Sequence, residues 1–259
     1  MHVVICQFLL WMVEQSVLLC LKAISASVLK AISASVCVCF PLHIGKHNDK
    51  KEYKLLDNIL ESYQNIRDLG IIIDKGLSFD DHINKIIRNA YFKIYQLLRI
   101  LKTRDSDTLL RAYKAYIRPQ LEYATEVWNP TKKGSINEIE KVKKHFTRRL
   151  FKIIGLTPTK YKERLLYLNL KELQQRRNVS DLVMAHKIIT NQTHLKPERY
   201  FSFAKMAKRK IYCLQHRKLS RKTYNNFFTK IIPTWNKLPN DILKIYKSKK
   251  FRENVSLKL

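Results

Sequence analysis

A long stretch of helical periodicity between residues 80 and 102 most constrains what this chain folds into. Its apolar residues recur every three or four positions, which places them on one side of a helix. They are Ile83, Ile86, Ile87, Ala90, Ile94, Leu97, Leu98 and Leu101. Asp80 and Asp81 suit the first turn, because acidic groups are favourable at a helix N-terminus. The stripe needs other helices to cover it, so we expect a mainly α-helical bundle.

Further segments supply those helices. Ser135 and Glu138 form a capping box that predicts a helix start, and Gly155 is placed to end that helix. Another start is predicted at Asn169. Residues 109–130 predict a helix that stops or bends at Pro119, which has no amide donor. Its large aromatic residues are predicted to pack in the core: Tyr113, Tyr116, Tyr123 and Trp128.

Two stretches read as β-strands, residues 36–44 and 66–74, because they are rich in Val and Ile and end at turn residues. Two or three strands alone are marginal without further cover. The predicted fold class is therefore mainly α, a helical bundle with a small two- to three-stranded β part near residues 36–74.

The first 36 residues differ from the rest. They contain the octapeptide LKAISASV twice, at residues 21–28 and 29–36. Two copies are too few for a repeat fold. Residues 1–21 are apolar enough for a signal peptide or membrane anchor. However, Glu14 interrupts the apolar stretch, and no Lys or Arg stands before that stretch begins. We expect four segments: an extension at 1–36, a β part at 37–76, a helical region at 77–197 and a basic helical tail at 198–259.

Charge is the unusual property of this composition. The chain has 50 Lys and Arg against 21 Asp and Glu, a formal net charge of +29. Such an excess is relieved by a polyanion whose phosphates the cations neutralise, so RNA or DNA is the predicted partner. An anionic membrane surface is the alternative, and we consider it the weaker one. Neither a small-molecule substrate nor a particular oligomeric state is indicated.

The candidate nucleic-acid-binding residues fall in three groups. The first is an acid-free run on the predicted helix after Ser135: Lys141, Lys143, Lys144, Arg148, Arg149 and Lys152. The second is Arg176 and Arg177, which could instead cap a neighbouring helix or pair with Asp181. The third lies in the tail, where residues 199–240 lack any acid: Lys208, Arg209, Lys210, Arg217, Lys218, Arg221 and Lys222.

Catalytic and metal-binding patterns are weak. Cys37, Cys39, His43 and His47 form the tightest group of zinc-type ligands, but their spacing is poor, since Pro41 and Gly45 prevent a helix from aligning the histidines. Five cysteines without framework spacing indicate a reducing, intracellular compartment, nuclear or cytoplasmic. We therefore expect no metal, no cofactor and no catalytic residue.

Several blocks carry a family resemblance. They read RDLGIIID at residues 67–74, LSFDDHINKI at 77–86, LLRAYKAYIRPQLEYATEVWNP at 109–130, YKERLLYLNLKELQQRR at 161–177 and FFTKIIPTWNKLP at 227–239. In this order they resemble the C-terminal part of reverse transcriptases from jockey-like and CR1-like non-LTR retrotransposons. The resemblance implies the last palm strands, a thumb and a helical tail, with Trp235 and Leu238 anchoring a tail helix.

The resemblance does not extend to the polymerase chemistry. That chemistry uses two metal ions held by palm carboxylates, one of them in a Tyr-x-Asp-Asp hairpin. The adjacent Asp80 and Asp81 lack this setting. The implied function is a truncated, non-catalytic fragment that binds RNA or DNA without sequence preference. Two alternatives stay open: a piece that completes a polymerase on a separate palm subunit, and a membrane-anchored or secreted basic protein.

Overall fold

The computed structural model describes residues 41–44, 52–55, 58–59, 61–157, 159–204, 212–215 and 227–258. It divides the chain into two compact units, residues 1–82 and 83–259. The predicted extension, its repeat and most of the group of zinc-type ligands, for which no metal site was predicted, lie outside the described residues. Of that group only His43 is described, and it stacks on Tyr53 with ring centroids 6.0 Å apart.

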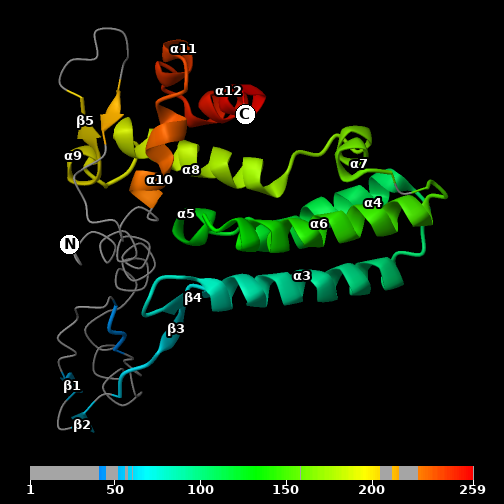
Figure 1. Ribbon diagram of the computed structural model, residues 1–259, viewed down its shortest axis with the longest axis horizontal. Helices are drawn as coiled ribbons and strands as arrows, with labels where there is room; N and C mark the ends of the chain where they lie inside the picture. Colours follow the sequence, from blue (N-terminus) through cyan, green and yellow to red (C-terminus); the bar gives the residue numbers. More distant parts are fainter. Residues whose placement is uncertain are drawn as a thin grey trace, which may run out of the picture. The chain divides into compact units, whose positions relative to one another are not determined.

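The predicted fold class is confirmed, because helices dominate the described residues and their strands form small antiparallel pairs (Figure 1). The strands are β1 (Lys54–Leu55), β2 (Asn58–Ile59), β3 (Asn65–Asp68), β4 (Ile71–Asp74), β5 (Ser202–Phe203) and β6 (Leu214–Gln215). The helices are α3 (Asp80–Ile100), α4 (Ser106–Ala112), α5 (Thr125–Trp128), α6 (Lys133–Ile153), α7 (Tyr161–Tyr167), α8 (Leu173–Ile189), α9 (Pro197–Tyr200), α10 (Phe227–Trp235), α11 (Asn240–Leu243) and α12 (Ser248–Lys258).

In the first unit, the strand predicted over residues 66–74 is instead the hairpin β3–β4. Leu69 and Gly70 have φ of 44° and 87°, and two successive left-handed residues make the tight turn that joins twisted antiparallel strands. The other strand prediction is wrong where it is tested, since residues 41–44 belong to no strand. The sequence pattern predicted β-structure correctly but not the turn within it, because Leu69 stands where Asn or Asp usually precedes the glycine of such a turn.

The loop after β4 is organised by Asp74. Its carboxylate accepts hydrogen bonds from the amides of Gly76 at 2.9 Å, Ser78 at 3.1 Å and Phe79 at 2.7 Å. Partial burial acts against the charged form, but these hydrogen bonds prevail and lower the pKa of Asp74. The loop leads directly into α3, whose first turn contains Asp80 and Asp81 as predicted.

In the second unit, α6 lies between α3 and α8 (Figure 1). Its apolar side packs against the segment after α4, where Tyr113 stacks on Phe146 with centroids 4.4 Å apart. The side chains with 0% exposure at this centre are Leu109, Tyr113, Ile117, Leu121, Ile139, Val142, Phe146 and Leu150. Burial of this apolar area is the main stabilising contribution to the bundle.

The chain bends at Pro119, as predicted. After α4 a π-helical turn covers Tyr113–Ile117 and a 3-10 turn covers Arg118–Leu121 with the proline near its start. Tyr113 and Trp128 are buried, which confirms their core placement, but Tyr116 and Tyr123 are exposed, so their core prediction is wrong. The wider π turn shifts Tyr116 off the face that an α-helix would share with Tyr113.

Helix ends follow the predictions only in part. Gly155 has φ of 80°, and the amide of Leu156 donates to the Phe151 carbonyl at 2.9 Å, which ends α6 as predicted. The predicted starts are too late for α6, which begins at Lys133 without a side-chain cap, and too early for α8, which begins at Leu173.

The tail packs on α8 through α10 and α12. Trp235 and Leu238 are buried, as predicted for an anchor, and the Trp235 Nε1 donates to the Tyr212 carbonyl at 2.9 Å. The tail helices therefore form part of the second unit.

Candidate nucleic-acid interface

Three cations form a row along the outer side of α6. Lys144, Arg148 and Lys152 are exposed and are each four residues apart. An α-helix rises about 1.5 Å per residue, so successive charges are about 6 Å apart along the axis. Like charges at this spacing repel one another, so the row disfavours an isolated helix and favours a bound anion.

Few acidic groups offset this row. In the described part of the chain, Arg148, Arg149 and Lys152 have no carboxylate within ion-pair distance. The exception on this helix is Lys141, whose Nζ lies 2.5 Å from the Glu138 carboxylate. Lys144 lies over the Tyr161 ring, 5.3 Å from its centroid, and forms no ion pair with a described carboxylate. Guanidinium and ammonium groups in this state are suited to phosphate contacts.

A groove beside the row joins α6 to α3. Its lining includes Tyr95 and Arg99 from α3 and His145 and Arg149 from α6, and its volume is about 160 Å³. The rings of Tyr91 and His145 meet edge to face, 5.4 Å apart. Burial, followed by the charges of Arg149 and Arg148, lowers the pKa of His145, so its ring is neutral at neutral pH. The groove thus combines aromatic rings with cations.

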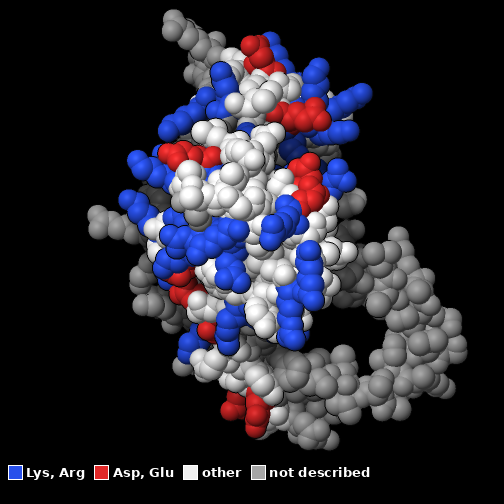
Figure 2. Space-filling view, turned by 90° about the vertical axis from the view of Figure 1, so that its right-hand side faces the viewer, with Lys and Arg blue, Asp and Glu red and all other residues white. Residues whose placement is uncertain are grey.

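Figure 2 views the molecule from the right-hand side of Figure 1, onto α7 and the last turns of α3 and α6. Lys and Arg side chains cover much of this face, and Asp and Glu gather in separate small groups. This face of the described residues therefore presents many cations on an accessible surface.

Lys143 is a correction to the predicted site. It is 1% exposed, and its Nζ donates to the carbonyl of Lys171. Position 143 follows Val142 on the inward side of α6, so the side chain extends into the bundle. Burial lowers the pKa of Lys143 to about 8, against the opposing effect of Glu140. It contacts a backbone carbonyl and is not available to a phosphate.

The prediction that Arg177 lies on a nucleic-acid-binding surface is also wrong, since this side chain is 0% exposed. Its Nε donates to the Asn129 Oδ1 at 3.1 Å, and the Asn129 Nδ2 donates to Asp181 at 2.7 Å. Lys230 reaches the same carboxylate at 2.8 Å. The alternative interpretation, a direct pair with Asp181, is not observed among the described residues, because Asn129 lies between Arg177 and Asp181 and contacts both. Burial is the largest effect on the Asp181 carboxyl and raises its pKa.

Arg176 is partly exposed, but its guanidinium is already bound by a carboxylate. Its guanidinium binds both carboxylate oxygens of Glu122, with the Nη2 contact at 2.8 Å. This two-pronged geometry is the strongest that Arg and a carboxylate adopt. Arg176 therefore links α8 to the segment before α5, and its charge is largely compensated. The seven predicted tail residues, Lys208, Arg209, Lys210, Arg217, Lys218, Arg221 and Lys222, lie outside the described residues.

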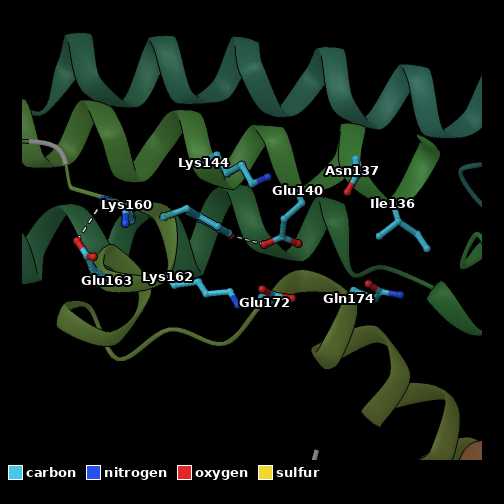
Figure 3. A pocket seen from close by; sticks show the side chains of 10 residues that line it. Ile136, Asn137, Glu140, Lys144, Lys160, Lys162, Glu163, Glu172 and Gln174 are labelled. Carbon is cyan, nitrogen blue, oxygen red and sulfur yellow. Dashed lines mark hydrogen bonds between the residues drawn. The ribbon is translucent and has the colours of Figure 1, made fainter. Parts of the chain in front are cut away.

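A pocket of about 450 Å³ opens where α6, α7 and α8 meet (Figure 3). At its base the Glu140 carboxylate accepts from the Tyr161 hydroxyl and from the amide of Leu173, the latter at 3.0 Å. Lys144, Lys160 and Lys162 line it together with Glu140, Glu163 and Glu172. Lys144 belongs to both the pocket and the cationic row, but three carboxylates line the pocket with the three lysines, so its lining carries no net excess of positive charge. Its hydrogen bonds fix the start of α8 against α6.

No metal-binding group of three or more His, Cys, Asp or Glu side chains occurs in the described residues. Asp81 accepts a hydrogen bond from Asn65 at 3.2 Å, and Asp80 lies beside it in the first turn of α3. None of the helices in the described ranges combines the length and apolar character that crossing a bilayer requires.

One curated protein provides a sequence comparison. "Uncharacterized protein B0403.1" of Caenorhabditis elegans is 31% identical to this chain over 132 residues, which is 51% of this chain and 67% of the nematode protein. The chain belongs to the family of that protein. No protein-family model and no solved structure matches this chain.

The aromatic part of this candidate interface was not predicted from the sequence. Tyr91, Tyr95 and Arg99 on α3, with His145 on α6, were not among the predicted site residues. The signal was available, since Phe92 and Tyr95 fall outside the apolar stripe of α3. Large aromatic residues on the polar side of an amphipathic helix are candidates for binding.

Proposed function

We propose that this chain binds RNA or DNA without sequence preference through the outer face of α6, and that it does so without catalysis. In this proposal it corresponds to the thumb-like, C-terminal part of a reverse transcriptase of the non-LTR retrotransposon type. The observation that carries it is the row of Lys144, Arg148 and Lys152, with Arg149 beside it, exposed and free of acidic partners in the described part of the chain.

Electrostatics support this assignment. Each phosphate that a cation neutralises releases condensed counterions, so binding is favoured by entropy and weakened by salt. The net charge of +29 attracts any polyanion, and the row supplies a local site with regular spacing. The resemblance of residues 67–239 to the last palm strands, thumb and tail of a reverse transcriptase points to the same class of ligand.

Salt dependence is the direct test. Fluorescence anisotropy of a labelled oligonucleotide with the full chain, between about 50 and 200 mM salt, measures the slope of log K against log salt. Replacing Arg148, Arg149 and Lys152 by Gln should lower the magnitude of that slope by about 2 to 3, because each contact contributes about 0.7 to 0.9. Undetectable or salt-independent binding by the unmodified chain would refute the proposal.

A matched variant controls for net charge. Lys249, Lys250 and Arg252 on α12 are exposed, and their replacement by Gln removes the same three charges at another place. We expect this variant to keep most of the slope. An equal loss in both variants would show that total charge, and not α6, governs binding. Circular dichroism establishes that both variants are folded.

The absence of catalysis has its own test. A primer extension assay with the purified full chain, deoxynucleotides and Mg²⁺ or Mn²⁺ should give no incorporation. Incorporation that stays with the chain through purification would contradict this half of the proposal and leave the binding half unaffected.

A further inference from the structure

A second row of side chains runs along α3. Arg88, Phe92, Tyr95 and Arg99 are separated by four, three and four residues, so they lie on one line of the helix. Phe92 is 61% exposed and Tyr95 is 60% exposed. Neither ring has an aromatic partner in the described part of the chain. The row therefore presents two adjacent open rings between two guanidinium groups.

These rings are exposed because the opposite side of α3 is packed in the core. On the opposite side of α3, Ala90 is 0% and Ile94 is 1% exposed, which fixes the rotation of the helix about its axis. Two large rings three residues apart lie about 5 to 6 Å from each other at their Cβ atoms. Single exposed aromatics are common on proteins, but a contiguous pair bounded by cations is a feature that calls for a ligand.

We propose that this row is a stacking platform for unpaired bases of single-stranded RNA or DNA. The inference rests on the proposed function and narrows its ligand to unpaired strands. Aromatic rings stack on any base and so bind single strands without sequence preference. In a duplex the bases stack on each other and only phosphates are offered to such a surface, so the rings would add little.

The surrounding charges match a single strand. Residues 82–104 contain no Asp or Glu, and Arg88 and Arg99 are about 16 Å apart along the helix. Across the groove, Arg149 lies beside Tyr95 and Arg99. Bases on Phe92 and Tyr95 would leave their phosphates within the reach of these guanidinium groups. The platform and the α6 row then form the two sides of one strand path.

The same charges argue against a second copy of this chain as the occupant. Two such faces brought together would place Arg88 and Arg99 against their own copies without any acidic group on the row, which is unfavourable. A polyanion with flat apolar groups meets both features of the row at once.

The test compares single-stranded and duplex oligonucleotides of equal length in anisotropy measurements with the full chain. Replacing Phe92 and Tyr95 together by Ala should weaken single-strand binding by about fivefold or more per ring, and should leave duplex binding nearly unchanged. A single strand that contains 2-aminopurine should lose fluorescence on binding to the unmodified chain and keep it with the variant. The conservative Phe92→Tyr change should retain binding.

An exposed ring elsewhere provides the control. Tyr246, before α12, is similarly exposed, and Tyr246→Ala should bind single strands like the unmodified chain. Salt-dependent binding with no effect of the ring variant would overturn the platform while the proposed function stands; no binding of either oligonucleotide overturns both. If the ring variant abolishes self-association in analytical ultracentrifugation without changing single-strand affinity, the face is a contact between copies and the inference fails.

Discussion

Helices α6 and α8 both carry clusters of cations, but only α6 presents them to solvent. On α6, Arg148, Arg149 and Lys152 are exposed and have no acidic partner among the described residues. On α8, Arg177 is buried and Arg176 is bound by Glu122. A basic cluster in the described part of this chain is thus either exposed to solvent, as on α6, or part of the internal network of hydrogen bonds and ion pairs, as on α8.

The difference arises from what lies opposite each helix. The segment from 122 to 129 contributes Glu122, Glu126 and Asn129 to the side of α8, where they meet Arg176, Ser180 and Arg177. Among the described residues, no acidic segment of this kind forms ion pairs with the outer side of α6. The number of basic residues therefore does not locate an interface, whereas the position of acidic groups across the bundle does.

The largest effect that would sharpen this comparison is expected at Asp181. Removing this carboxylate by Asp181→Ala leaves Lys230 without its ion-pair partner and Asn129, which holds Arg177, without its acceptor. Breaking a buried ion pair in this way costs about 3 to 5 kcal/mol in the free energy of unfolding. Denaturant-induced unfolding followed by circular dichroism measures the loss.

A surface carboxylate gives the reference for that measurement. Asp241 is exposed in the first turn of α11, and Asp241→Ala should cost about 1 kcal/mol or less. Equal losses for the two variants would mean that the buried network around α8 adds no stability and that the contrast with α6 lacks an energetic basis.

Arg176 tests the comparison at a partly exposed position. Arg176→Gln removes a two-pronged ion pair whose side chains are 36% and 20% exposed, so solvent screening reduces its contribution. We expect a loss of about 1 to 2 kcal/mol in stability. The salt slope of nucleic-acid binding should stay unchanged. A slope that falls as much as for a change on α6 would place α8 in the interface after all.

These contrasts also show which parts of the fold were predictable. The apolar stripe of α3 and the helix stop at Gly155 follow from local pattern, and both are observed. The burial of Lys143 and Arg177 was not predictable in this way, because it depends on the Lys171 carbonyl and on Asn129, which lie 28 and 48 residues away in the chain. Periodicity locates the inward side of a helix, but it does not show which polar groups of other segments lie opposite that side.

His186 extends the comparison to pH, with an effect that appears only in acidic solution. It is buried on α8, stacks on Phe251 at 4.0 Å, and its Nε2 lies 2.6 Å from the Ile245 carbonyl. Burial lowers the pKa of His186. A depressed pKa in the folded state means that its stability contribution is complete above the unfolded value of about 6.5 and is lost as pH falls below it.

The variant His186→Gln isolates this contribution, because Gln donates to the same carbonyl and does not titrate. The unfolding free energy of the unmodified chain should fall more steeply between about pH 7 and pH 5 than that of the variant. Parallel curves would exclude His186 as an acid-sensitive contact between α8 and α12.

The smallest effect is expected at Glu138. On α6 this residue pairs with Lys141, whereas the neighbouring cations of the row have no acidic partner among the described residues. Its pair with Lys141 is exposed on both sides, and such pairs contribute about 1 kcal/mol or less to stability. Glu138→Gln should therefore unfold like the unmodified chain. Because it frees Lys141 next to the α6 row, the salt slope of binding should increase by at most about one. An unchanged slope would mean that the strand path begins at Lys144, whereas a measurable increase would show that an acidic partner alone keeps a cation of α6 out of the interface.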